Sequence, residues 1–450
     1  AGVSTVTLPR GGGSFLPTHL PDPDVNLTAD KGRYGYIRDR YFGSLIVSKT
    51  FGDYELSYRG GYFRSEDNRD APSFPRSSIA GQDPIYGSLI GTPEITLGSS
   101  ANSFSTSSEV FQNTSHQLVL LSPSGKPFRW RVGAYYFWEQ DKSNFQTFAS
   151  PTNPTGLLSI QSFKNIAGFG GFDWDFADGF TLSGEARYAS ETLKYPKCAF
   201  CFIPNDIDAS ETSNDFTPRV TLGYKLTPDN MIYVLYSRGV KSGRFSNITP
   251  PGGTQTVLYA RPEKLDNFEF GSKNTFMGGR AVVNLSVFYD RVKDQQLTST
   301  TPYQFVNTQG QTVTGNITAT NNVGKSDIYG FELETSFRVT PRFSIDGAVG
   351  YAHQEFVNSD PVILQASSAV GFPGAVGSPI IMKGKTQANV PRWNGYVAAQ
   401  YVVPMGSADL KLRADANYRG KLYADLANIT AIRPAWTINA RATYAMNNWD

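Results

Sequence analysis

Polar and apolar residues alternate one by one over residues 409–419, which read Asp-Leu-Lys-Leu-Arg-Ala-Asp-Ala-Asn-Tyr-Arg. One parity holds Asp409, Lys411, Arg413, Asp415, Asn417 and Arg419, and the other holds Leu410, Leu412, Ala414, Ala416 and Tyr418. Successive side chains of a β-strand point to opposite faces. This segment therefore predicts a long strand with one charged face and one apolar face.

The same alternation returns in segments that short turn signals separate. These signals combine Gly, Pro, Asn and Asp as hairpin turns require, and they include Phe51-Gly52-Asp53, Ala177-Asp178-Gly179, Thr227-Pro228-Asp229-Asn230 and Thr340-Pro341-Arg342. Alternating strands are predicted around 128–136, 280–290, 331–339 and 436–444. We predict about fifteen strands in the chain, and no segment shows the period of a helix.

Long polar stretches rich in Gly, Ser, Asn and Pro separate one hairpin from the next. They fall near 65–108, 141–157, 193–214, 245–263, 296–320, 356–386 and 421–433. Short and long connections therefore alternate, as they do in outer-membrane barrels with short periplasmic turns and long extracellular loops. The pattern predicts an all-β fold, a transmembrane antiparallel up-and-down β-barrel. Its apolar face would meet lipid, and its charged face would line a wet lumen.

Composition argues against a nucleic-acid partner and against a membrane-spanning helix. The chain has 450 residues, a net charge of +2 and a mean hydropathy of −0.32. The small net charge gives no reason to expect a nucleic-acid partner. No run of about 18 apolar residues is present, which excludes a membrane-spanning helix. Aromatic residues make up 13% of the chain and cluster near predicted strand ends, where they fit a membrane-interface girdle or ordinary cross-strand pairs.

The chain contains two cysteines, Cys198 and Cys201. A Cys-x-x-Cys pair can be a redox motif, half of a zinc site or a short loop disulfide. The redox motif would need a helix near a βαβ unit, and zinc would need two more ligands in a chain with three histidines. We favour a loop disulfide over free thiols, with a metal site last. An oxidising compartment fits that choice.

Three further runs of residues form a series along the chain. They are Phe216–Val220 with Arg238–Phe245, then Pro262–Lys273, then Asn322–Glu334. In this order they resemble F-P-R-V with R-G-x-K-S-G-x-F, P-E-x-x-x-N-x-E-x-G-x-K, and N-x-G-K-x-x-x-x-G-x-E-x-E. These patterns are those of TonB-dependent outer-membrane receptors, especially the sphingomonad and caulobacter type. The resemblance covers most of residues 110–450.

The resemblance implies a barrel of about 22 strands whose lumen is plugged by an N-terminal domain. About fifteen strands are predicted here, residues 1–30 read as a loop, and family members continue beyond residue 450 with two more strands. A partial barrel would leave unpaired strand edges in lipid. We therefore expect residues 1–450 to be one partial outer-membrane β-barrel domain of a longer protein. The N-terminal plug and the last strands would lie outside it.

Catalytic motifs are missing from the sequence, and we expect neither an enzyme nor a cofactor or metal site. Glu332 and Glu334 share one strand face, as paired catalytic carboxylates do, but a charged lumen wall explains them better. Arg129 and Arg131 also share the lumen-facing parity. They either pack in the wall or contact a plug or an anionic ligand, and wall packing is the interpretation we favour.

A basic group, Arg238, Lys241 and Arg244, lies at the outer end of a predicted strand, close to the connection near 245–263. Ferric siderophores are usually anionic, so this basic rim can attract such a ligand. Basic residues at the outer end also bridge lipopolysaccharide phosphates. The sequence leaves both uses open.

The resemblance implies a receptor and transporter of the bacterial outer membrane that imports a scarce solute, with a ferric siderophore as the preferred choice. Its partners would be outer-membrane lipid and lipopolysaccharide, the small-molecule ligand, and a TonB-type energy-coupling protein reached through the missing N-terminal region. The alternative is a plugless passive porin or a structural outer-membrane barrel. An upstream plug domain would separate these two hypotheses.

Overall fold

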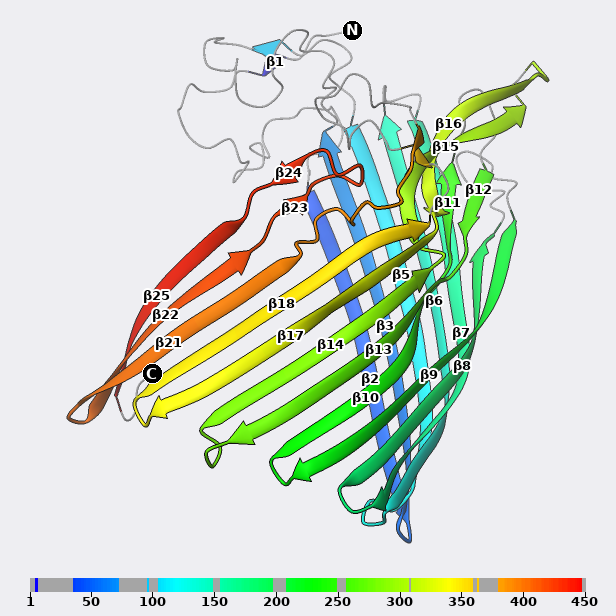
Figure 1. The fold of residues 1–450 in the computed structure, drawn as a ribbon. Coiled ribbons are helices and arrows are strands. Elements are labelled where there is room, and N and C mark those ends of the chain that lie inside the picture. Colours follow the sequence, from blue (N-terminus) through cyan, green and yellow to red (C-terminus); the bar gives the residue numbers. More distant parts are fainter. Residues whose placement is uncertain are drawn as a thin grey trace.

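The computed structural model describes residues 5–6, 35–72, 95–96, 104–148, 154–196, 208–248, 256–306, 309–358, 362–363 and 379–446. Fifteen strands form one sheet in which each strand pairs antiparallel with its neighbours along the chain (Figure 1). In order they are β2 (Gly35–Phe51), β3 (Tyr54–Pro72), β5 (Phe104–Leu121), β6 (Phe128–Phe148), β7 (Pro154–Ala177), β8 (Phe180–Tyr195), β9 (Ala209–Thr227), β10 (Asn230–Lys241), β13 (Glu263–Phe276), β14 (Ala281–Lys293), β17 (Lys325–Thr340), β18 (Phe343–Asn358), β21 (Trp393–Met405), β22 (Ala408–Arg419) and β25 (Ala435–Met446).

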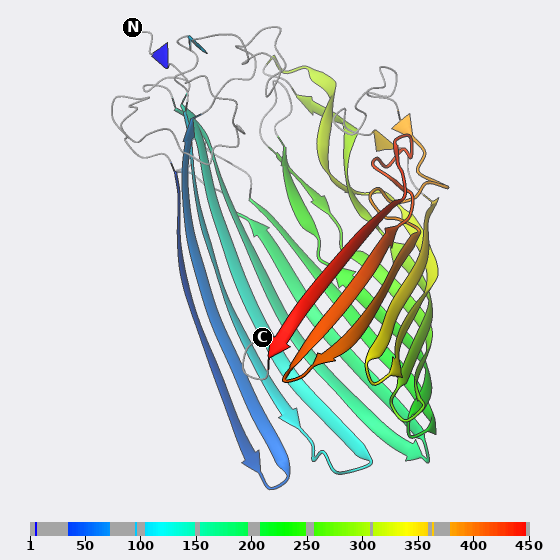
Figure 2. The same ribbon diagram turned by 90° about the vertical axis from the view of Figure 1, so that its left-hand side faces the viewer.

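This sheet confirms the predicted all-β, antiparallel up-and-down fold and the count of about fifteen strands. It curves like the wall of a barrel, but it is not closed, because β2 and β25 are its two edges (Figures 1 and 2). In the described part of the chain, no helix is long and apolar enough to cross a membrane.

The two ends of the sheet differ in how the strands are joined. Short turns join β2 to β3, β7 to β8, β9 to β10 and β21 to β22 at one end, which we call the turn end. The other end, the outer end, carries four small sheets (Figure 1). Their strands are β1 (Thr5–Val6) with β4 (Ile95–Thr96), β11 (Arg244–Ile248) with β12 (Thr256–Ala260), β15 (Gln296–Val306) with β16 (Thr312–Asn322), β19 (Val362–Ile363) and β20 (Pro379–Ile380), and β23 (Leu422–Tyr423) with β24 (Ala431–Ile432).

Many strands run further toward the outer end than the sequence pattern predicts. Most of 141–157, predicted as a connection, is strand, since β6 continues to Phe148 and β7 begins at Pro154. Even the shortest strands of the main sheet, β10, β22 and β25, have 12 residues. Crossing the hydrocarbon core takes about 9–11 residues. The outer parts of the strands therefore need no apolar face, which hides them from a search for alternation.

The two faces of the sheet separate by residue parity, as the alternation predicts. On β13, Phe268 and Phe270 lie beside Tyr236 and Val234 of β10 in the antiparallel register, and both phenylalanines are about half exposed. This apolar face is the one that faces lipid in an outer-membrane barrel. Glu269, between the two phenylalanines, points to the other face, the polar face.

The buried apolar side chains that form clusters lie at the outer end. Val323, Phe356, Met382 and Ala427 form one cluster, packed by Leu297 and Leu426. These residues come from three different connections and the end of β18. The outer connections therefore share a small core of their own.

Candidate functional site

Ion pairs line the polar face near the turn end. The Arg129 guanidinium donates to Asp175 at 2.7 Å, and Thr181 Oγ1 donates to the same carboxylate at 2.7 Å. Arg131 pairs with Glu185, two strands away. Both arginines were predicted to share the polar face, and both have carboxylate partners within the wall. Among the described contacts, this supports wall packing as their role.

The pair of Arg131 and Glu185 crosses β7 above a glycine. A Cβ added at Gly171 would lie 3.2 Å from Glu185 Cγ and 3.6 Å from Arg131 Cζ. A larger residue would therefore crowd the ion pair. The glycine at this position gives the two long side chains room to meet across the intervening strand.

A chain of hydrogen bonds runs up the polar face toward the outer end. Arg187 donates to Asn165 Oδ1 at 2.8 Å, and Asn165 Nδ2 donates to Glu191 Oε1 at 2.6 Å. Ser242, just after β10, donates to Glu191 Oε2 at 2.6 Å. Gln296 Nε2 then donates to the Ser242 carbonyl at 3.0 Å. The polar wall is thus tied to the first residues of two outer connections.

Arg238, the first member of the predicted basic rim, lies on the apolar face. Its Nε donates to Asp266 Oδ1 at 2.7 Å, Tyr236 donates to the same oxygen at 3.0 Å, and Lys293 Nζ binds Asp266 Oδ2 at 2.9 Å. The Asp266 side chain is only 9% exposed. Together they form an ionic cluster directly beyond the aromatic residues Tyr236 and Phe268, which is where lipid headgroups meet a barrel.

Lys241 lies on the opposite face from Arg238, because three positions separate them along β10. Its ammonium is 3.8 Å from Glu263 Oε2. The same carboxylate oxygen accepts a hydrogen bond of 2.7 Å from the Gln296 backbone. Lys241 is more than half exposed, so this contact leaves its charge accessible at the outer mouth of the polar face.

Arg244 starts β11, in the small sheet beyond the main strands, where it pairs in register with Ala260. It is exposed, and no carboxylate pairs with it among the residues that the structure describes. The structure therefore places Arg238 on the apolar face, Lys241 on the polar face and Arg244 in an outer hairpin. Lys241 and Arg244 are both exposed at the outer end.

The buried clusters of the outer end were missed by sequence reasoning. Phe356 is completely buried, its backbone N–H donates to the Lys385 carbonyl at 2.9 Å, and Gly384 N–H donates back to the Phe356 carbonyl at 2.9 Å. Gly384 and Lys385 are thereby held against the end of β18. Residues 356–386 were read as a polar connection, and the apolar Ile381-Met382 within it was the signal that the stretch has a packed part.

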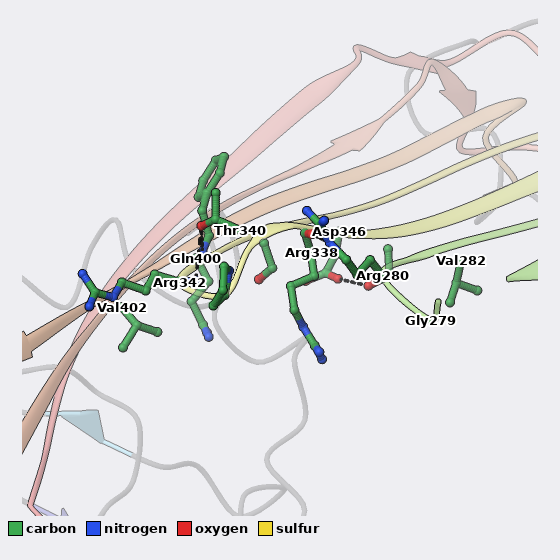
Figure 3. A pocket seen from close by; sticks show the side chains of 13 residues that line it. Gly279, Arg280, Val282, Arg338, Thr340, Arg342, Asp346, Gln400 and Val402 are labelled. Carbon is green, nitrogen blue, oxygen red and sulfur yellow. Dashed lines mark hydrogen bonds between the residues drawn. The ribbon is translucent and has the colours of Figure 1, made fainter. Parts of the chain in front are cut away.

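A polar cavity of about 280 Å³ lies on the polar face at the turn end, between β14, β17, β18 and β21 (Figure 3). Three arginines, Arg280, Arg338 and Arg342, line it with Asp346 and Gln400. The sequence pattern assigns none of these residues to a site, and Arg342 is predicted only as part of a turn. Arg338, Asp346 and Gln400 lie on the same face of β17, β18 and β21. Arg280, directly before β14, and Arg342, in the turn between β17 and β18, complete the lining.

Cys198 and Cys201 lie outside the described residues, so their disulfide stays a prediction. Within the described ranges, no group of three or more His, Cys, Asp or Glu side chains is arranged to hold a metal ion.

Fifteen antiparallel strands with one apolar and one polar face, short turns at one end and layered connections at the other, define the wall of an outer-membrane β-barrel. Residues 4–450 match the family model described as TonB dependent receptor-like, beta-barrel. The chain belongs to the TonB-dependent receptor family, and it represents the barrel of that family. This class is one of outer-membrane receptors and transporters rather than enzymes. The sphingomonad and caulobacter subtype stays a prediction.

Two curated relatives match about half of the chain. The probable TonB-dependent siderophore receptor PiuA of Acinetobacter baumannii is 24% identical over 245 residues, which are 53% of this chain and 29% of the relative. The probable TonB-dependent receptor BfrD of Bordetella pertussis is 25% identical over 251 residues, with the same two shares. The match thus spans less than a third of either relative.

Solved structures share the fold over most of the chain. The ferric yersiniabactin uptake receptor FyuA of Yersinia pestis matches with a TM-score of 0.63 and 18% identity, over 90% of this chain and 53% of its own. The copper transporter OprC matches with a TM-score of 0.61 and 13% identity, over 90% of this chain and 59% of its own. At these identities the likeness concerns the fold alone.

Proposed function

We propose that the protein containing this chain is a TonB-dependent receptor that binds a ferric siderophore outside the cell and imports it with energy relayed by a TonB-type protein. The observation that carries the proposal is the family match over residues 4–450. The names of PiuA and FyuA, a siderophore receptor and a ferric yersiniabactin receptor, support the ligand class. The hydrogen bonds of the polar face continue to the outer mouth. A polar wall of this kind supports the proposal that solute passes through the lumen.

Uptake of iron by living cells tests this function. The full-length gene would be expressed in a strain that lacks its own receptor, and ⁵⁵Fe bound to a panel of siderophores would be supplied with and without an intact TonB gene. We expect uptake of one ferric siderophore class that disappears without TonB. Equal uptake in both strains would instead establish a passive porin. Copper uptake is the matched comparison, because OprC is named a copper transporter.

For the basic rim we propose two separate roles. Lys241 and Arg244 attract the anionic ligand at the outer mouth, since both are exposed there. Arg238 and Lys293, on the apolar face, contact lipopolysaccharide phosphates next to the Tyr236 aromatic ring. Lys241→Gln/Arg244→Gln should lower the affinity for ligand and leave copurified lipopolysaccharide unchanged. Arg238→Gln/Lys293→Gln should do the opposite, and a swap of these outcomes would reject the assignment.

We also propose that residues 1–450 are a partial barrel domain that further strands complete. The two edge strands, β2 and β25, both run from the outer end to the turn end, because they are fourteen steps apart in a sheet whose strands alternate in direction. They cannot close the sheet by pairing antiparallel with each other, and unpaired edges are not stable in lipid. An odd number of additional strands is required. Peptide mapping of the native protein would show whether sequence for them, and for a plug, adjoins residues 1–450.

A further inference from the structure

The arginine-lined cavity at the turn end lies on one face of four adjacent strands. Arg338 of β17 lies opposite Ser344 of β18, and Ser344 lies opposite Gln400 of β21. Val282 of β14 lies opposite Ser336 of β17, and Ser336 has the same parity as Arg338, so Val282 is on the same face. The opposite parity carries Ile345 and Tyr401, which belong to the apolar face. The cavity therefore opens to the lumen side and not to lipid.

One of the three arginines is held by the wall, and the other two are not. Arg280 Nε donates to the Arg338 carbonyl at 3.2 Å, and its Nη2 donates to the Val339 carbonyl. Arg338 extends from the end of β17 and Arg342 from the turn that follows it (Figure 3). Among the described residues, neither of these two guanidinium groups makes an ion pair or a side-chain hydrogen bond.

The single carboxylate in the cavity is already used. Ser336 Oγ donates to Asp346 Oδ1 at 2.8 Å, and Arg413 Nη1 lies 3.6 Å from Asp346 Oδ2. Asp346 thus faces a fourth cation instead of neutralising the three arginines that line the cavity. The side chains that line the cavity therefore carry an excess of positive charge.

We propose that this cavity binds a carboxylate group. Guanidinium groups match planar carboxylates with paired hydrogen bonds, and Ser344 and Gln400 add neutral polar atoms beside them. At about 280 Å³ the space is smaller than the roughly 300–1,000 Å³ of a drug-sized ligand pocket, and its lining is polar where such pockets are mostly apolar. It fits one or two carboxylates and not a whole siderophore.

The carboxylate has two possible sources with the same chemistry. It is an acidic side chain of a polypeptide that enters the lumen from the turn end, or it belongs to a small anionic molecule on its way through. The inference does not depend on siderophore import. A failed iron-uptake experiment would leave it standing, and failure of the experiments below would leave the proposed transport function standing.

The free-anion source is tested with citrate, a tricarboxylate probe, by calorimetry on the full-length protein at low salt, where surface charge is least screened. Arg338→Gln/Arg342→Gln should weaken citrate binding at least tenfold. The control is Arg59→Gln/Arg219→Gln, which removes the same charge from the polar face outside the cavity. The control should bind citrate like the unchanged protein.

The polypeptide source is tested with the variants Arg338→Lys and Arg342→Lys. Both variants keep the positive charge, so we expect them to fold like the unchanged protein. Carbodiimide joins an amine to a carboxylate only when the two touch, and mass spectrometry then identifies the partner. We expect cross-links from position 338 or 342 to an Asp or Glu outside the fifteen-stranded sheet. The proposal is supported if either the citrate effect or such a cross-link is found. It is overturned if citrate binding is absent or equally affected in the control, and the only cross-links join Asp346 or Glu334.

Discussion

The turn end and the outer end of the sheet are built on different principles. At the turn end, short hairpins join the strands, and the ion pair of Arg129 and Asp175 connects neighbouring strands on the polar face. At the outer end, small sheets lie beyond the strands, and Phe356 and Met382 are fully buried. On the apolar face there, Asp266 pairs with both Arg238 and Lys293. The turn end is maintained by local pairing, and the outer end by contacts between distant segments.

This difference predicts that packing holds the side chains of the outer end in place. A receptor mouth has to hold its ligand-facing groups in fixed positions, and a connection without a core would not do so. Here the connection after β18 is hydrogen-bonded to the strand end, and it shares an apolar cluster with Val323 and Ala427. We expect that cluster to give the outer end a stability that the turn end lacks.

The largest effect is expected for Phe356→Ala, which removes a completely buried ring from the outer cluster. Truncation of a buried phenylalanine costs about 3–5 kcal/mol when the site does not collapse. We expect a loss of that size in the free energy of unfolding of the full-length protein, measured by urea titration in lipid vesicles. Limited proteolysis should also begin within residues 379–392.

Phe128→Ala is the matched control at the turn end. Phe128 begins β6 and is half exposed on the apolar face, where lipid or detergent replaces the lost contacts. We expect a loss of no more than about 1 kcal/mol there. Equal losses for the two variants would show that the outer end has no core of its own, and the contrast between the ends would fail.

The sequence predicts the strands and their short turns better than it predicts the packing of the outer end. The alternation in residues 409–419 predicted β22 (Ala408–Arg419) almost to the residue, because parity and hairpin turns are local properties. The packing of Phe356 on Met382 joins segments whose local composition is that of a polar connection, and no period marks it. The local pattern predicts the strands. The non-local packing of the outer layer leaves only a weak trace in the sequence, the apolar pair Ile381-Met382.

The candidate site shows the same limit within a single strand. Arg238, Lys241 and Arg244 are neighbours in sequence, and they were grouped for that reason. Strand parity sends Arg238 and Lys241 to opposite faces, and the end of β10 sends Arg244 into a different sheet. The arginines of the cavity, in contrast, are up to 62 positions apart, from Arg280 to Arg342, and the pairing of β14, β17 and β18 with the turns between them brings them together.

A medium effect is expected for Asp266→Asn, which leaves Arg238 and Lys293 without their shared carboxylate. Hydrogen bonds to charged groups contribute about 1.5–3 kcal/mol, and the aspartate side chain is only 9% exposed. We expect a loss of about 2 kcal/mol in the free energy of unfolding. The turn-end control Asp175→Asn removes a carboxylate that is 44% exposed, and its loss should stay below about 1 kcal/mol. A larger loss for Asp175→Asn than for Asp266→Asn would mean that the more stabilising ion pairs lie at the turn end.

The smallest effect concerns Tyr259, in β12 of the outer layer, outside the membrane-spanning strands. Its phenol packs above Gly243, where an added Cβ would lie 2.2 Å from the phenol oxygen. Burial raises the pKa of Tyr259 above its ordinary value, and the nearby carboxylates of Glu211, Asp215 and Glu191 raise it further.

A raised pKa means that the folded protein keeps this proton at a pH where the unfolded phenol, with a pKa of about 10, has lost it. The contribution of Tyr259 is therefore complete below pH about 10 and is lost as the pH rises from there through the folded pKa. Tyr259→Phe cannot ionise, so its free energy of unfolding should fall less steeply between pH about 9 and 11. Urea titrations of both proteins across that range measure the slopes. Identical slopes would mean that the outer layer does not shield the phenol, and that β12 is no better packed than an ordinary exposed hairpin.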